Sequence, residues 1–255
     1  MKTWQISLAI SGPHPNDVKH FGRWRRMIIA IHQPNYLPWL SYFGKIAAAD
    51  DFIFLDDAQF PKNSYTNRVQ VLAGGAAKWL TMPVTFRFGD AINAVMPAQQ
   101  DWARRHLDSL KGYYRRAKNF RRVWTRIEEI YLDVPNRDIA ASNRFLVETL
   151  AKEFGLTCQF HAASDIESRG AKGDARLVEL ANALCPGATY LSGSGGRNYQ
   201  SEDCFAKAGI ELRYIDFRHQ AYSQGQHEFV AGLSAIDAVF HLGWGGAADL
   251  IGASV

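Results

Sequence analysis

Short apolar runs alternate with helix-length segments along most of this chain, and this alternation constrains its fold more than any other feature. The run MIIAI is followed by a helical pattern, LSYFGKIAAA, and then by a second apolar run, DFIFLDD. Later the strand-like runs LTCQFHAAS, ATYLSG and IELRYIDF alternate with the helical segments DARLVELANAL and EDCFAKAG. This spacing predicts an α/β fold with a mainly parallel, Rossmann-like sheet and helices on both faces.

Two features interrupt the alternation. Residues 68–72 and 78–84 have the composition of paired strands, and the four residues 73–76 between them predict a β-hairpin with a loose turn. We expect residues 86–97 to be irregular. Residues 98–154 then carry apolar positions at helical spacing in three successive stretches, which predicts a helical insertion.

We expect residues 27–255 to form a single α/β domain that closes with a helix, LSAIDAVFHLG, and a glycine-rich tail. We interpret residues 1–26 as a loose, disordered N-terminal extension, with Met27 as a hypothetical physiological start. The apolar patch near the N-terminus is broken by Gln5 and Ser7 and lacks a convincing cleavage site, which argues against a signal peptide.

Composition and charge narrow the function. The 255 residues are 47% apolar and 21% charged, which is ordinary for a folded protein. The formal net charge of +4 suits an anionic small-molecule substrate and is too weak to indicate nucleic-acid binding. The three cysteines are widely spaced, which favours reduced thiols in the cytoplasm over a disulfide framework. The apolar runs fall short of the roughly 20 residues that span a bilayer, so we expect no membrane span.

The first strand-like run leads into a polar segment, IHQPNYLPW, whose two prolines fix the backbone angle φ and stiffen it. In open α/β sheets, ligands bind outside the carboxyl ends of the strands. A neutral histidine at such a place serves as an acid or a base. The segment therefore predicts His32 as a catalytic residue and Gln33 and Asn35 as substrate-binding residues. The alternative is that these side chains are hydrogen-bonded structural residues.

A second polar cluster, DDAQFPKNSYTNR, follows the second strand-like run. We predict that Asp56 and Asp57 act in catalysis by binding an amine or a hydroxyl, while Arg68 binds a carboxylate or phosphate. Two adjacent acids are a weak metal signal, because neighbouring strand residues point to opposite faces. The alternative is a solvated, salt-bridged loop. The predicted substrate-binding residues of this second cluster are Gln59, Lys62, Asn67 and Arg68.

The third cluster, SGSGGRNY, follows the strand-like run ATYLSG. Glycine-rich backbone can surround an anion with N–H groups, and Arg197 adds positive charge. The segment is neither a Walker loop nor GxGxxG nor a GxSxG elbow, and a purely structural turn is the alternative. A parallel sheet would bring all three clusters to one edge. The predicted substrate-binding residues here are Ser192, Gly193, Ser194, Arg197 and Tyr199.

Other candidate motifs are weaker. The basic aromatic run from Tyr113 to Arg122 can contact nucleic acid, but a solvated helix face with buried aromatic rings is favoured. The remaining histidines show no HxxxH or HExxH spacing, so no metal site is predicted. The early histidine is analogous to the HxGH signature of nucleotidyltransferases, yet Pro38 and Trp39 occupy the place of its second histidine.

Together these motifs resemble the WbqC-like protein family. The resemblance runs from Met27 to about Gly243 and rests on IHQPNYLPWLSYFGKI, DDFIFLDDAQFPKNSYTNR with KWLTMPV, the W…HL…Y pattern of residues 102–114, TYLSGSGGRNY and AYSQGQHEFVAGLSAIDAVFHLG. The family is named from bacterial genes in surface-polysaccharide clusters, notably O-antigen clusters. The resemblance implies a cytoplasmic, enzyme-like protein in the biosynthesis of activated sugars or amino sugars, and it supplies no catalytic assignments.

The first functional hypothesis is therefore a transferase or ligase that adds a small group to a polar or anionic substrate, such as a sugar nucleotide, an amino sugar or an amino acid. One alternative is a non-catalytic metabolite-binding or scaffolding module of a biosynthetic cluster. A second alternative is a nucleotidyltransferase-like adenylating enzyme. No cofactor is assigned, and the oligomeric state is left open.

Overall fold

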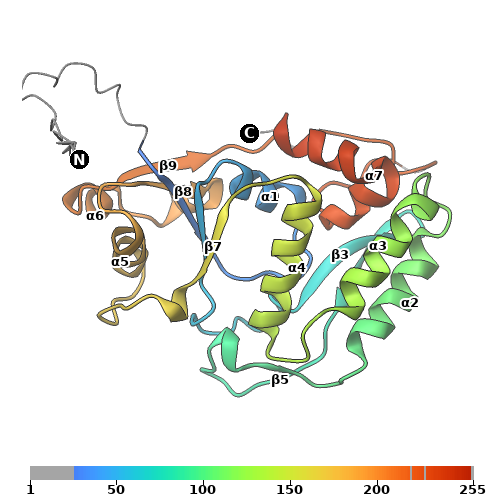
Figure 1. The fold of residues 1–255 in the computed structure, drawn as a ribbon, viewed down its shortest axis with the longest axis horizontal. Coiled ribbons are helices and arrows are strands. Elements are labelled where there is room, and N and C mark those ends of the chain that lie inside the picture. Colours follow the sequence, from blue (N-terminus) through green and yellow to red (C-terminus); the bar gives the residue numbers. More distant parts are fainter. Residues whose placement is uncertain (1–25, 219, 227, 254–255) are drawn as a thin grey trace, which may run out of the picture.

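The computed structural model describes residues 26–218, 220–226 and 228–253 and has an α/β fold (Figure 1). Apart from Arg26, the predicted N-terminal extension lies outside the described residues. The central sheet has five strands, and every neighbouring pair is parallel. Its spatial order is β7-β2-β1-β8-β9, with the bounds β1 Ile28–His32, β2 Asp51–Phe54, β7 Gln159–Ala162, β8 Thr189–Gly193 and β9 Glu211–Ile215.

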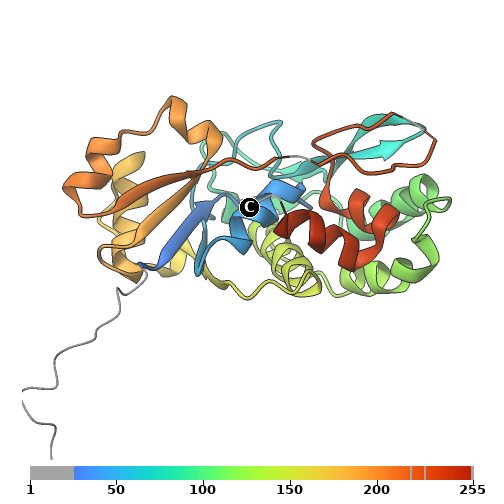
Figure 2. The same cartoon turned by 90° about the horizontal axis from the view of Figure 1, so that it is seen from above.

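Helices cover both faces of this sheet, as predicted. Successive strand residues point to opposite faces, so Ile29, Ile31 and Ile53 contribute to one apolar core, which includes α5 (Asp174–Leu184) and α6 (Glu202–Lys207). Ala30 and Phe52 face the other core, which includes residues of α1 (Leu40–Ala47), α4 (Ile139–Glu153) and α7 (Ala235–Gly252). Figure 2 shows α5 and α6 at one end of an elongated molecule.

The segment between β2 and β7 builds the opposite end of the molecule (Figures 1 and 2). It contains the predicted hairpin, the predicted helical insertion and a small second pair of strands. The insertion packs on α7 and on the hairpin, and its apolar residues are continuous with the core on that face of the sheet. The bounds are β3 Arg68–Ala73, β4 Ala76–Thr81, β5 Val84–Thr85, β6 Met96–Pro97, α2 Trp102–Tyr114 and α3 Phe120–Leu132.

Three local predictions need correction. The hairpin turn is tight, because Gly74 and Gly75 both adopt positive φ and form a two-residue loop. The segment predicted to be irregular contains a short helix, Ile92–Ala94, and strand β6. The predicted glycine-rich tail is helical, because α7 continues beyond a kink at Gly243. Ala247 and Ile251 in this last part of the helix are completely buried and anchor it to the core.

Four other parts of the chain hold residues 34–38, which follow β1: helices α2, α3 and α4, and Ser234 directly before α7. The buried Asn143 of α4 donates from Nδ2 to the carbonyls of Pro34 and Thr66, at 2.8 and 2.7 Å. The buried Tyr36 hydroxyl lies 2.6 Å from ring and hydroxyl atoms on α2 and α3, and Ser234 donates to the Leu37 carbonyl at 2.7 Å. These bonds hold Leu37 at a φ of 40°, which is uncommon for a residue other than glycine.

None of the helices in the described ranges has the length and apolarity needed to cross a membrane. Cys158, Cys185 and Cys204 are free thiols.

Replacing Asn143 with Ala should lower the free energy of unfolding by about 2–4 kcal/mol, because two buried carbonyls lose their donor. Urea denaturation measures this change. The matched control is Asn136→Ala at an exposed position, which should cost less than about 0.5 kcal/mol. The hydrogen bonds to residues 34–38 form a clamp on this segment. Equal stability of the two variants would show that this clamp does not stabilise the fold.

Candidate active site

A cleft of about 1180 Å³ opens outside the carboxyl ends of β1, β2, β7 and β8. From β1 the chain adds β2 and β7 on one side and later returns to add β8 and β9 on the other. The strand order therefore reverses between β1 and β8, and open α/β sheets bind ligands at such a switch point. The charged residues that line the cleft are Lys45, Asp57, Lys172, Asp174 and Arg176.

His32 is the last residue of β1 and lies in the wall of this cleft. Its Nδ1 is 3.0 Å from the carbonyl oxygen of Gln33. A carbonyl only accepts hydrogen bonds, so Nδ1 carries the proton and Nε2 keeps its lone pair. Burial, together with the positive charge of Lys45, lowers the pKa of His32 to about 3. The imidazole is therefore neutral at pH 7, with Nε2 as an acceptor.

Lys45 is a candidate that reasoning from the sequence missed. Its side chain projects from α1 into the wall of the cleft, the residue is 5% exposed, and Nζ donates to the Ile31 carbonyl at 2.8 Å. Burial lowers the pKa of this amine to about 7. The sequence did contain a signal for the burial of Lys45. It is the single charge in the otherwise apolar helix LSYFGKIA, and a helix that is apolar on all sides is usually buried.

A smaller chamber of about 300 Å³ adjoins the cleft, and His32, Lys45 and Tyr199 line both spaces. The glycine-rich segment 193–196 forms one wall of the chamber. Its other walls are rich in aromatic rings, namely those of Trp39, Tyr42 and Phe217. The cleft thus carries most of the charged side chains and the chamber most of the aromatic rings, and the two spaces meet at His32, Lys45 and Tyr199.

Close contacts around Gly196 shape the glycine-rich segment. A Cβ atom at this position would lie 2.3 Å from Ser192 Oγ and 2.4 Å from Gln200 Oε1. Atoms that are not bonded do not approach so closely, so only glycine fits without displacing these groups. Ser192 is 3% exposed and lines the cleft beside Gln200, whose buried Oε1 has no hydrogen-bond partner.

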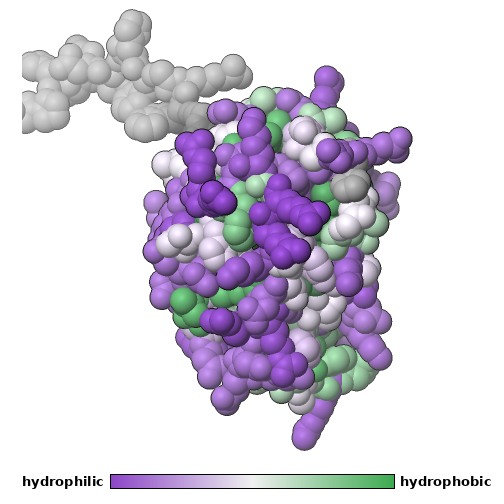
Figure 3. Space-filling model, turned by 90° about the vertical axis from the view of Figure 1, so that its right-hand side faces the viewer, coloured by the Kyte–Doolittle hydropathy of each residue, from purple (hydrophilic) through white to green (hydrophobic). Residues whose placement is uncertain are grey.

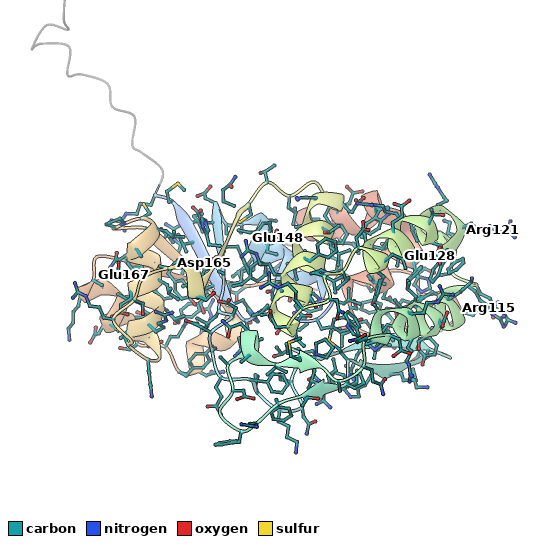
Figure 4. All side chains as sticks on the ribbon, turned by 60° about the horizontal axis from the view of Figure 1, so that its bottom comes forward. Arg115, Arg121, Glu128, Glu148, Asp165 and Glu167 are labelled. Carbon is teal, nitrogen blue, oxygen red and sulfur yellow. The ribbon has the colours of Figure 1, made fainter. Side chains whose placement is uncertain are left out.

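The two adjacent acids after β2 point into different spaces. Asp57 lines the cleft and pairs with Arg176 at 2.5 Å. Asp56 accepts hydrogen bonds from the backbone N–H and the hydroxyl of Ser164, at 3.0 and 2.6 Å, and lines a separate cavity of about 550 Å³ beside α4. Glu148 and Asp165, labelled in Figure 4, also line that cavity. Within the described residues, no group of three His, Cys, Asp or Glu side chains can hold a metal ion.

The structure brings part of the predicted site together. The predicted residues that line the cleft are His32, Gln33, Asp57, Gln59, Ser192 and Tyr199, and those in the chamber include Gly193 and Ser194. The second and third clusters therefore both reach the space beside the first. The predicted residues that line neither space are Asn35, Asp56, Lys62, Asn67, Arg68 and Arg197.

Three of the residues outside these spaces have other partners. Asn67 is buried and donates to the Met82 carbonyl at 2.9 Å. The guanidinium of Arg68 lies 4.2 Å from the ring centre of Trp79 on the hairpin. Arg197 pairs with Asp216 at 2.7 Å. Of the others, Asn35 is buried and Lys62 is exposed.

A fourth polar segment, for which the sequence analysis made no functional prediction, also lines the cleft. It follows β7 and includes Ser164, Gly170, Lys172 and Gly173, and Arg176 comes from the first turn of the next helix, α5. The available signal in the sequence was two glycines beside a lysine and an arginine after a strand, and both glycines adopt positive φ in the structure.

The fold and the cleft define an α/β protein with a large cleft at the switch point of a parallel sheet. The sequence profile of the WbqC-like protein family matches residues 33–248, and the chain belongs to this family. It is also 30% identical over 221 residues to the uncharacterized protein Rv1507c of Mycobacterium tuberculosis, an alignment that covers 84% of this chain and 94% of that protein.

Replacing Gly196 with Ala should lower the free energy of unfolding by about 1–3 kcal/mol, because the new methyl group displaces Ser192 and Gln200. The neighbouring Gly195 provides a matched control, since a Cβ there meets nothing within 4 Å. Gly195→Ala should change stability by less than about 0.5 kcal/mol. Chemical denaturation of both variants tests this, and similar costs would contradict the close packing at residue 196.

Replacing Lys45 with Met should raise the free energy of unfolding at pH 7 by about 1–3 kcal/mol, because it removes a buried amine that prefers to be charged. The folded-state pKa is lowered, so the burial cost is greatest below pH 7 and falls as the pH rises toward the ordinary lysine value. The advantage of the variant should therefore shrink between about pH 7 and 10. Urea denaturation across this range tests the prediction, with exposed Lys152→Met as the control.

Proposed function

We propose that this WbqC-like protein is an enzyme that transfers or ligates a small group onto a polar or anionic substrate. The observation that supports this best is that two spaces of different character meet at His32 and Lys45. A transfer between two molecules requires that both reach the same acid–base groups, and holding them together removes much of the entropic barrier. One space alone would suit a simple binding protein equally well.

The charges of the cleft suit an anionic group. Lys45, Lys172 and Arg176 line it together with two acids, Asp57 and Asp174, so the lining has one more basic than acidic side chain. An anion bound near Lys45 favours the charged amine and raises its pKa above 7. The cleft volume of about 1180 Å³ is large enough for a nucleotide or a sugar nucleotide.

His32 has the proton arrangement of a general base. Its Nδ1–H is held by the Gln33 carbonyl, so Nε2 is the atom that can accept a proton from an attacking hydroxyl or amine. In the ligand-free protein the pKa of about 3 makes this imidazole a weak base. A bound anion favours the imidazolium and raises this pKa, so basicity is gained when the substrate is in place.

The aromatic chamber suits the ring of a sugar or an amino sugar. Trp39 in its wall lies 4.7 Å from the ring of Tyr65, which lies 5.6 Å from the ring of the half-exposed Trp79. Aromatic faces offer flat apolar surfaces with polar edges, against which ring-shaped ligands pack. We therefore favour a sugar nucleotide or amino sugar, in surface polysaccharide or related biosynthesis in the cytoplasm, over an amino acid.

Two other functions remain as alternatives. A non-catalytic metabolite-binding module is favoured by the low pKa of His32, which suits a hydrogen-bond acceptor better than a base. An adenylating enzyme is favoured by the position of this histidine, at the end of the first strand and at the switch point of the sheet. Both alternatives place the ligand in the same cleft.

A screen of sugar nucleotides, ATP and CTP, each with amino acids or amino sugars and with mass spectrometry as the readout, tests this proposal. We expect a sugar nucleotide to raise the melting temperature and to give a new product. His32→Ala should slow product formation by about 100-fold or more, because it removes the acid–base group. His161→Gln is the control, since His161 pairs with Asp51 outside the cleft.

The other outcomes separate the alternatives. Binding without any product would favour the metabolite-binding module, and release of pyrophosphate from ATP or CTP would favour the adenylating enzyme. Unchanged turnover in His32→Ala, with the product still formed, would exclude the acid–base role of this residue.

A further inference from the structure

A second polar cavity, of about 820 Å³, lies at the end of the molecule away from α5 and α6. Its walls come from the hairpin turn at Gly74 and Gly75, from the end of α2, and from residues 223–226. His241 of α7 is 8% exposed and completes the lining. None of these residues lines the switch-point cleft or its chamber.

Buried polar groups support this cavity. Asp237 is fully buried and accepts hydrogen bonds from the hydroxyl groups of Tyr114 and Tyr222, at 2.9 and 2.6 Å, and from Gln224 at 2.9 Å. Tyr114 and Gln224 also line the cavity, so the network fixes two of its wall residues. His241 Nε2 has no hydrogen-bond partner and lies 3.8 Å from Asp237, beyond hydrogen-bonding distance.

Basic side chains surround the opening. Arg115, Arg116 and Lys118 follow α2, line the cavity and are exposed. No acidic group of the described residues lies within ion-pair distance of any of them. Figure 3 shows that hydrophilic side chains dominate the face of the molecule at this end, and Figure 4 places Arg115 and Arg121 there, far from Glu167.

We propose that this cavity binds a phosphorylated small molecule at a site separate from the switch-point cleft. Two arginines and a lysine supply charge-assisted hydrogen bonds to phosphate oxygens. The turn at Gly74 and Gly75 brings the backbone to the cavity wall without side chains, and the imidazole of His241 provides a further polar group.

A cavity and a flat basic surface make different predictions. An extended polyanion would contact every exposed basic residue at this end, including Arg121 and Arg122 on α3, which do not line the cavity. A small phosphorylated ligand in the cavity contacts the lining residues alone. The volume of about 820 Å³ is in the range of small-molecule sites, and its lining of glutamine and tyrosine side chains suits a polar ligand.

Titration of the full chain with pyrophosphate, followed by amide NMR, tests this site. We expect saturable shifts of the Gly74, Gly75 and Gly225 signals, which report on the cavity wall. The double variant Arg115→Gln/Arg116→Gln should weaken binding by about tenfold or more, because two charge-assisted contacts are lost. The matched double variant Arg121→Gln/Arg122→Gln carries the same charge change and should stay within about twofold of the wild type.

Three results would overturn the proposal. The first is the absence of saturable shifts at these glycines, and the second is confinement of the shifts to Gly193, Gly195 and Gly196 of the chamber. The third is an equal loss of affinity in both double variants, which would indicate a diffuse attraction to the basic surface. Because this cavity shares no lining residue with the cleft or the chamber, failure of this proposal does not affect the proposed function of the cleft. Failure of the proposed function likewise does not affect this proposal.

Discussion

The clamp on residues 34–38 is the constraint on which the rest of the structure depends. Carbonyls of this segment accept hydrogen bonds from Asn143 and Ser234, and its buried Tyr36 hydroxyl bonds to two further helices. Buried polar groups are costly when unpaired, so the surrounding elements must take up these positions together. The clamp therefore fixes the exit of β1 and the start of α1 with one set of contacts.

The packing of α1 against the sheet buries the amine of Lys45, at a cost in stability. The clamp and α1 place an amine in a wall with 5% exposure, where burial lowers its pKa to about 7. A hydrophobic side chain would be more stable there, and a buried amine with a lowered pKa marks a candidate functional group. Its bond to the Ile31 carbonyl holds the charge next to His32, at the boundary between the cleft and the chamber.

The sequence predicted the parts of the fold that follow from local periodicity. The strand and helix alternation, the hairpin and the helical insertion are all observed, and the polar segment at His32 does lie at the switch point. Asn67 and Arg68 lie away from the cleft, because twelve residues separate Asn67 from the end of β2 and the chain uses that length to enter the hairpin. Lys45 was missed although it is the single charge in an otherwise apolar helix, a pattern that indicates burial.

We propose that His32 is held as a neutral imidazole, with Nδ1–H bonded to the Gln33 carbonyl and Nε2 left to accept a proton from a bound substrate. Long-range nitrogen–proton NMR of the histidine rings, assigned with His32→Gln, measures the tautomer and the pKa directly. We predict a proton on Nδ1, an unprotonated Nε2 at pH 7 and no titration of this ring above about pH 5, since burial lowers its pKa. A proton on Nε2, or titration near the ordinary histidine pKa, would contradict the proposed site.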